Sequence, residues 1–176
     1  MTLPDGRDSA TRNAEVIRAG TEQYWNSRVR VAPPAEFAED VVVRAPKLPA
    51  AGAPDAYHGH DGLQQLWEHL HIAYPDFHME VQDVIAEGDR AAAQFRVTGT
   101  NTGEWFGIPP SGKAVSFEEV EIFRFENGLI REITVVFDML DLGRQLGLVP
   151  EGPPPRVFLL LMRAAGKLRR RRGAPA

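Results

Sequence analysis

The chain has 176 residues, 43% of them hydrophobic and 25% charged, and it contains no cysteine. This length suits one globular domain with a core of its own, and the lack of cysteine excludes disulfide bonds and thiolate chemistry. The part before Pro150 holds 13 basic and 23 acidic residues, and this net charge of −10 argues against nucleic acid as its main ligand.

The first predicted helix begins at Asp8 or Ser9, since either side chain can cap it, and runs to about Ser27. Its apolar side ends in Tyr24 and Trp25. These two aromatic residues either pack in the core or, where the helix covers a cavity, contact a ligand.

Between residues 33 and 73 the pattern changes twice. Pro33-Pro34 interrupts the chain, after which we expect a short helix through Phe37 and a short strand at residues 41–43. Residues 46–54 form a long loop of Ala, Pro and Gly, which we interpret as a flap at the mouth of a cavity. A helix capped by Asp61 is then predicted to Ala73, because apolar residues repeat at i, i+3, i+4 and i+7: Leu63, Leu66, Trp67 and Leu70.

Histidines flank this second helix. His60 and His71 either lie near the cavity or serve as surface or capping residues. His58 and His60 have the i, i+2 spacing of a strand pair of zinc ligands, but nothing nearby supplies a third ligand. We therefore expect no metal site.

Four strands are predicted after Pro75, beginning near Phe77, Arg90, Ala114 and Leu129. The first alternates apolar residues on one face, from Phe77 to Ile85. Asn127-Gly128 marks a tight hairpin between the third and fourth strands, because both residues tolerate positive φ. Helices followed by antiparallel strands predict an α+β fold, a curved antiparallel sheet with helices on one face.

The third strand is apolar on both faces. Phe117, Phe123 and Phe125 share one parity, whereas Val120 and Ile122 take the other. Since the face away from the helices also needs cover, we expect a homodimer that packs through the sheet.

The segment from Thr98 to Leu148 resembles the SnoaL-like polyketide cyclase family of the nuclear transport factor 2-like superfamily. The resemblance rests on the loop Gly103–Gly112, on Phe123-Arg124-Phe125, and on Asp138 shortly before Leu142–Gly147. It implies a cone-shaped sheet with helices packed on its concave face, spanning residues 8–149. It also implies a small apolar or aromatic substrate and no cofactor.

Asp138 is the predicted catalytic residue. It follows an apolar strand, where partial burial raises the pKa of a carboxyl group toward that of a general base. Alternatively, it is an exposed cap of the turn from Met139 to Leu146. The resemblance implies that an Asp at this position removes a proton next to a carbonyl group, after which the carbanion closes a ring by aldol addition.

The chain departs from the family pattern at two polar positions. It has Asn101 where members often have His, and Ile133-Thr134-Val135 where they often have His-Trp-Asp. Asn101 can donate a hydrogen bond to an oxyanion but cannot exchange a proton at neutral pH. The residues predicted to contact substrate are Tyr24, Trp25, His60, Trp67, His71, Trp105, Phe106 and Glu121. Glu119, Glu121 and Arg124 lie on one central strand, and two interpretations are open for them: one parity of the strand faces the cavity, or these residues form an ordinary solvated or paired face.

The segment from Pro150 to Ala176 has a net charge of +6 and a different character. A polyproline spacer leads into an apolar block and a basic run, which predict either a disordered tail or a helix that contacts a membrane surface or a partner. No stretch of the chain is long enough to span a membrane and no early segment suits a signal peptide, so we expect a cytoplasmic protein.

The family resemblance, together with these patterns, implies a SnoaL-like cyclase that acts on an apolar carbonyl compound by acid/base catalysis. Two alternatives stay open. One is an isomerase, dehydratase or epoxide hydrolase of the same superfamily, and the other is a non-catalytic module that binds a small molecule.

Overall fold

A computed structural model describes residues 6–46 and 54–149 of the chain. Most of the predicted flap at residues 46–54 and the whole predicted tail from Pro150 lie outside the described residues. No helix in the described ranges is long and apolar enough to span a membrane.

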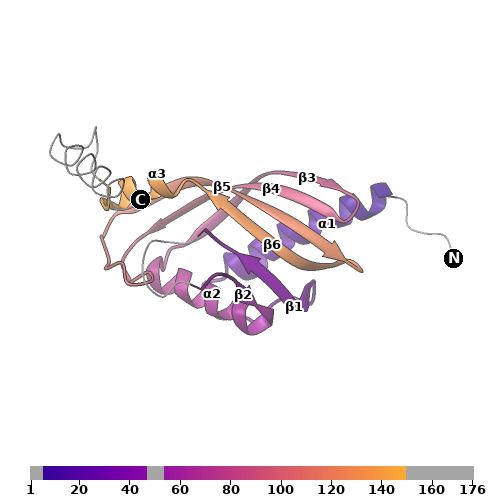
Figure 1. Cartoon of the computed structure of the whole chain (residues 1–176), viewed down its shortest axis with the longest axis horizontal. Coiled ribbons are helices and arrows are strands. Elements are labelled where there is room, and N and C mark those ends of the chain that lie inside the picture. Colours follow the sequence, from indigo (N-terminus) through magenta and orange to yellow (C-terminus); the bar gives the residue numbers. More distant parts are fainter. Residues whose placement is uncertain (1–5, 47–53, 150–176) are drawn as a thin grey trace, which may run out of the picture.

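The helices and strands follow the order shown in Figure 1. The helical elements are α1 (Gly6–Gly20), the π-helical turn η1 (Thr21–Trp25), α2 (Gly59–Ala73) and α3 (Met139–Leu146). The strands are β1 (Phe37–Arg44), β2 (Tyr57–His58), β3 (His78–Glu87), β4 (Arg90–Thr100), β5 (Ala114–Glu126) and β6 (Leu129–Phe137). The α+β class predicted from the sequence is confirmed.

The strands form one open sheet in the order β2-β1-β6-β5-β4-β3. Strands β3 to β6 are antiparallel neighbours, as predicted. Asn127 and Gly128 both have positive φ, 54° and 79°, which confirms the tight turn between β5 and β6. Strand β1 is parallel to β6, however, so the sheet is mixed rather than wholly antiparallel.

Two local predictions in the first half of the chain were wrong. Phe37 is the first residue of β1 and pairs with Ile130 of β6, so no short helix precedes this strand. Helix α2 begins at Gly59, and Asp61 lies in its first turn instead of capping it. In both places, pairing with distant segments decided the local structure.

A β-bulge in β3 overturns a third expectation. The pairing of β3 with β4 shifts register between Val81 and Asp83. An extra residue reverses the parity of the strand beyond it, so Val84 packs against the core and Ile85 is exposed to solvent. Alternation alone had placed Ile85 on the same face as Phe77.

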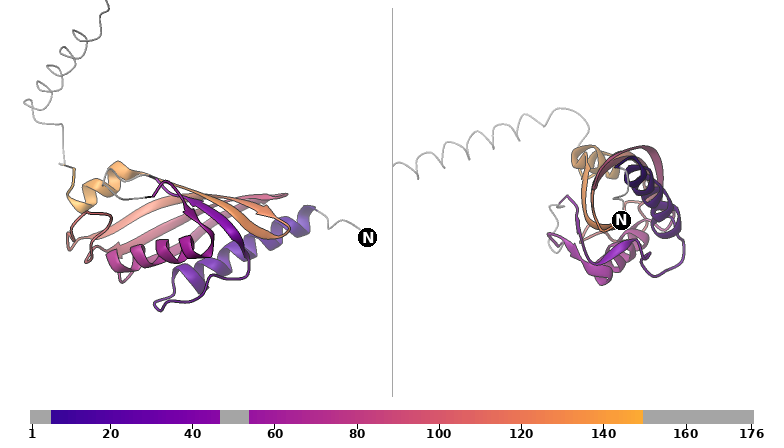
Figure 2. Two further views of the ribbon diagram at one scale, coloured as in Figure 1. Left: turned by 60° about the horizontal axis from the view of Figure 1, so that its bottom comes forward. Right: turned by 90° about the vertical axis from the view of Figure 1, so that its right-hand side faces the viewer.

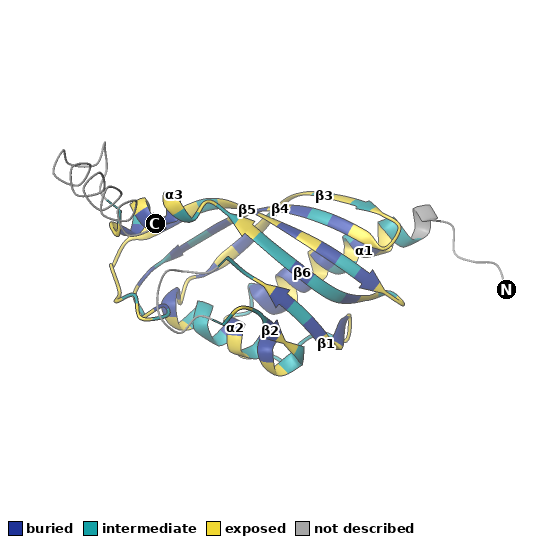
Figure 3. Ribbon diagram, in the orientation of Figure 1, coloured by how far each residue is buried: buried dark blue, intermediate teal, exposed yellow. Residues whose placement is uncertain are grey.

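The helices and the curved sheet enclose the core. Helix α1 contacts β3 and β4, α2 contacts β1, and α3 contacts β5. The end-on view in Figure 2 shows the strands bending in an arc beside the helices. Buried and exposed residues alternate along β5, as Figure 3 shows, so one face of this long strand looks inward and the other outward.

Candidate functional site

An apolar cavity with a volume of about 90 Å³ lies between the sheet and the helices. Its wall is built from segments far apart in sequence, because η1, α2, α3 and all six strands each contribute side chains. Most of these are aliphatic or aromatic, such as Leu66, Phe77, Met79 and Leu142. A cavity with this lining favours a small apolar ligand.

Two carboxylic acids interrupt this apolar wall. Glu119 and Glu121 of β5 both line the cavity, and their exposed fractions are only 8% and 5%. Residues two apart on a strand point to the same face, so the inward alternation of β5 brings both carboxyl groups to the cavity. Their cross-strand neighbours are apolar: Phe95 and Phe137 beside Glu119, and Ala93 and Val135 beside Glu121.

The two carboxyl groups share a hydrogen bond, and among the described residues no cationic side chain lowers the pKa of either. Burial raises the pKa of Glu119 to about 8, although its hydrogen bond with Glu121 acts in the opposite direction. Burial raises the pKa of Glu121 as well, helped by the charge of Glu119 and by the hydrogen bond between them. The hydrogen bond thus favours the proton on Glu121 and the negative charge on Glu119.

Sequence reasoning named Glu121 as a substrate contact and set Glu119 aside as part of a solvated face. The structure brings both to the cavity. The signal that could have found them is parity, because Val115, Phe117, Phe123 and Phe125 share their face of the strand. Two glutamates among the otherwise apolar residues of one strand face are exceptional, since unpaired carboxylates are rarely buried.

A tight turn places two aromatic residues in the cavity wall. The backbone N–H of each of Trp105 and Ile108 donates to the carbonyl oxygen of the other, at 2.9 Å in both cases. The two residues between them, Phe106 and Gly107, have positive φ of 48° and 80°. Positive φ is uncommon for a bulky residue such as Phe106 and often marks a functional site. Trp105 and Phe106 both line the cavity, where their rings can contact a ligand.

Asn101 holds this loop in place and is fully buried. Its amide nitrogen donates to the carbonyl oxygens of Ala73 and Gly103, at 3.5 and 3.0 Å, and its side-chain oxygen accepts from the N–H of Ser111 at 2.8 Å. All the hydrogen-bonding groups of the side chain are therefore engaged. Asn101 does not line the cavity, so its geometry gives it a structural role instead of the predicted catalytic one.

Asp138 lies outside the cavity. Its side chain is exposed, and one carboxylate oxygen accepts from the backbone N–H groups of Leu140 and Asp141 at 2.9 and 3.0 Å. It is the N-cap of α3. The predicted partial burial of this carboxylate is therefore wrong, because the strand ends before Asp138 and the backbone donors of the helix bind it.

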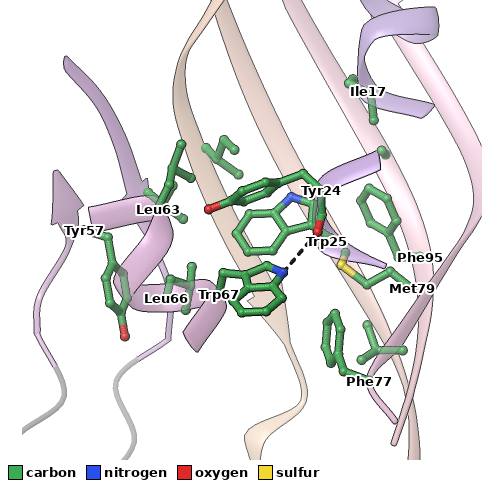
Figure 4. Close-up of a cluster of buried hydrophobic side chains, with 14 of the residues drawn as sticks. Ile17, Tyr24, Trp25, Tyr57, Leu63, Leu66, Trp67, Phe77, Met79 and Phe95 are labelled. Atoms are coloured by element: carbon green, nitrogen blue, oxygen red, sulfur yellow. Dashed lines mark hydrogen bonds between the residues drawn. The ribbon is translucent and has the colours of Figure 1, made fainter. Parts of the chain in front are cut away.

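Of the other aromatic residues predicted to contact substrate, only Trp25 lines the cavity. Tyr24 is packed beside it, and Trp67 donates its indole N–H to the Tyr24 carbonyl oxygen at 3.1 Å, as Figure 4 shows. His71 stacks on Trp67 at 4.0 Å between ring centroids and contacts the Trp67 carbonyl oxygen. These contacts belong to the core.

The two histidines predicted near the cavity have structural partners. His60 forms a 3.0 Å hydrogen bond with the carbonyl oxygen of Phe37, which ties α2 to β1. Burial lowers the pKa of His71, so this ring favours the neutral form. Within residues 6–46 and 54–149, no three His, Asp or Glu side chains gather as ligands for a metal ion.

The chain shares its fold with solved structures. A candidate SnoaL-like polyketide cyclase from Jannaschia sp. CCS1 has a TM-score of 0.64 at 22% identity, covering 85% of this chain and 99% of that one. IdmH, a candidate polyketide cyclase from Streptomyces antibioticus, has a TM-score of 0.60 at 26% identity, covering 77% and 98%. AclR, a candidate hydroxylase from Streptomyces galilaeus, has a TM-score of 0.60 at 25% identity, covering 97% and 100%.

A curved α+β sheet around an apolar cavity defines a class of proteins that take small hydrophobic molecules. Residues 15–146 match the family described as SnoaL-like polyketide cyclase. The chain belongs to this family. No curated protein matches it.

Proposed function

We propose that this protein is an acid/base enzyme of the cyclase or isomerase type and that Glu119 and Glu121 are its catalytic residues. The substrate is an apolar compound with an acidic C–H group next to a carbonyl group. One observation carries this proposal: two carboxyl groups lie side by side in the wall of an apolar cavity, with raised pKa values. Perturbed carboxyl groups in a cavity are typical of acid/base sites.

The pair can supply a base and an acid at the same time. The Glu119 carboxylate removes the proton from carbon, while the Glu121 carboxyl group gives its proton to the carbonyl oxygen, so the substrate becomes an enol. Burial supports the first step because a desolvated carboxylate is a stronger base than one in water.

Ring closure follows from the enol when the substrate carries a second carbonyl group. The enol carbon bonds to that carbonyl carbon, the enol O–H returns its proton to Glu121, and Glu119 passes its proton to the new alkoxide. Both carboxyl groups then regain their starting states. Return of the proton from Glu119 to a different carbon would instead complete an isomerisation.

Asp138 remains the alternative acid/base, on the strength of the family resemblance alone. A non-catalytic module would be expected to hold Asp138 with backbone donors, and such donors are present. The buried Glu119 and Glu121 pair favours an enzyme, because a site that only binds apolar molecules gains nothing from buried carboxyl groups.

The test is exchange of the protons beside the carbonyl group of 2-tetralone, a bicyclic ketone with one aromatic ring, with deuterium from the solvent. We expect the wild-type protein to accelerate exchange above the buffer rate, with saturation in ketone, as measured by proton NMR. Binding is measured in parallel by equilibrium dialysis. Saturable binding without accelerated exchange would contradict the proposal and support a non-catalytic binding module.

We further propose that a second copy of the chain covers the outer face of the sheet. Val120, Ile122 and Val136 are 40%, 45% and 53% exposed there, and Val120 pairs with Val136 across β5 and β6. A cluster of exposed aliphatic residues on a sheet favours association.

The dimer is tested by light scattering after size exclusion. Wild type is expected to elute as a dimer and Ile122→Lys as a monomer, because a lysine at the interface would bring an unpaired charge. Val29→Lys is the control, since Val29 is exposed but lies outside the sheet. A monomeric wild type at micromolar concentration would contradict the proposal.

A further inference from the structure

Two residues of the cavity wall each carry a buried hydrogen-bond donor that has no partner among the described residues. The hydroxyl group of Tyr74 and the indole N–H of Trp105 are buried, and neither has a hydrogen-bond partner among the described residues. Both residues line the cavity, and their rings meet edge to face with centroids 5.6 Å apart. Unpartnered buried donors are rare in folded proteins because each has lost its hydrogen bonds to water without gaining another, so such a pair needs an explanation.

The fold holds these two residues at one end of the cavity. Tyr74 follows α2 and packs on Gly99, where a Cβ atom would lie 3.1 Å from the tyrosine side chain. The loop that carries Trp105 is docked on the same end of α2, because Thr102 and Gly103 donate to the Ala73 carbonyl oxygen at 3.0 and 3.2 Å. The two donors are therefore fixed relative to each other.

The acid pair is some distance away from them. Gly99 pairs with Val115 of β5, and Glu119 is four residues further along that strand. With a rise of about 3.3 Å per residue, the backbone positions are separated by about 13 Å. A ligand that uses both regions must be longer than a single ring.

We infer that Tyr74 and Trp105 form a binding subsite for an oxygen atom of the ligand, at the opposite end of the cavity from Glu119 and Glu121. The ligand class is an elongated, flat, apolar molecule with a ketone, quinone or phenol oxygen at the end remote from the reacting carbon. Burial raises the pKa of Tyr74 to about 12, so the phenol keeps its proton and remains a donor at neutral pH.

This inference rests on the proposed function in one respect, which is that the substrate binds in the same cavity. It can be tested by ligand binding alone, without measuring catalysis. The probes are 9-fluorenone, a flat ketone with no acidic C–H group, and fluorene, which has the same rings but no oxygen. Equilibrium dialysis measures the affinity of each probe for wild type, Tyr74→Phe and Trp105→Phe. These variants remove one donor each and keep an aromatic ring.

We expect each variant to bind fluorenone about five- to tenfold more weakly, as for one lost hydrogen bond, and fluorene with unchanged affinity. Tyr24→Phe is the matched control, because the Tyr24 hydroxyl is also buried without a partner in the described part of the chain but does not line the cavity. Its affinity for both probes should equal that of wild type, and unchanged fluorene binding shows that each variant is folded.

Three results would overturn the inference. The first is unchanged fluorenone affinity in both Tyr74→Phe and Trp105→Phe. The second is loss of fluorenone affinity only when Glu119 and Glu121 are replaced by glutamine, which would place the oxygen at the acid pair. The third is no binding of either probe to wild type. If Glu119 and Glu121 proved not to be catalytic, the expected affinities for fluorenone and fluorene would stay the same.

Discussion

Replacement of Glu119 or Glu121 by glutamine is expected to slow deuterium exchange into 2-tetralone by about 10²- to 10⁴-fold, the usual contribution of a general acid or base. Glutamine keeps the shape of the side chain but can neither remove nor release a proton near neutral pH. Binding of the ketone should change little. Because the two groups act as a unit, the double variant should lose little more than either single variant.

Two further variants complete this experiment. Glu118→Gln is the matched control, since Glu118 is on the same strand but exposed and paired with Arg96. Asp138→Asn separates the two assignments, because asparagine also caps helices well. We expect both variants to exchange at the wild-type rate. A loss of 100-fold or more confined to Asp138→Asn would return the catalytic role to Asp138.

The pH dependence of stability should carry the signature of the same pair. The pKa values of Glu119 and Glu121 are raised in the folded protein, so the folded state binds more protons than the unfolded state above the ordinary glutamate pKa of about 4.3. The stability that the protonated pair contributes is complete below that pH. It is lost as the pH rises toward the folded pKa of Glu119, about 8.

The slope is at most about 1.4 kcal/mol per pH unit for each group, so the free energy of unfolding should fall steadily between pH 5 and 8. Thermal melts of wild type at pH 5.5, 7 and 8.5 should show a falling melting temperature. The double glutamine variant should melt higher than wild type at pH 8.5 and show a flatter profile, whereas Glu118→Gln should follow wild type. A wild-type profile that rises from pH 5.5 to 8.5 would show that the pair is not desolvated in the folded protein.

The fold was largely predictable because its strongest signals are local. The alternation along β4 and β5 and the Asn127-Gly128 turn depend on residues close in sequence. The parallel pairing of β1 with β6 depends on contacts between distant segments. The bulge at Val81 depends on the register between β3 and β4, which the alternation within β3 does not contain. For that reason Phe37 and Ile85 were misplaced while β5 and β6 were not.

The site was less predictable, because one sequence pattern fits two structures. An acid after an apolar strand is either a semi-buried base or the cap of a following helix, and Asp138 is the second. For Glu119 a solvated face was the favoured interpretation, because glutamate side chains are usually solvated. Glu121 was predicted only to contact substrate, and neither residue was predicted to act as acid or base. Glu119 and Glu121 differ from solvated glutamates because they lie on the same face of β5 as Phe117 and Phe123. This shared face indicates burial only when the structure shows that it points into the protein.

The cap formed by Asp138 affects how mutations at this position must be interpreted. Helix α3 begins at this cap and carries Leu142, whose side chain forms part of the cavity wall. Asp138→Ala would remove two hydrogen bonds to the helix and cost about 0.5–2 kcal/mol. The loosened helix would shift Leu142 and disturb ligand binding from a distance. An inactive alanine variant would thus imitate the loss of a catalytic base, whereas the asparagine variant leaves the helix anchored and reports on proton transfer alone.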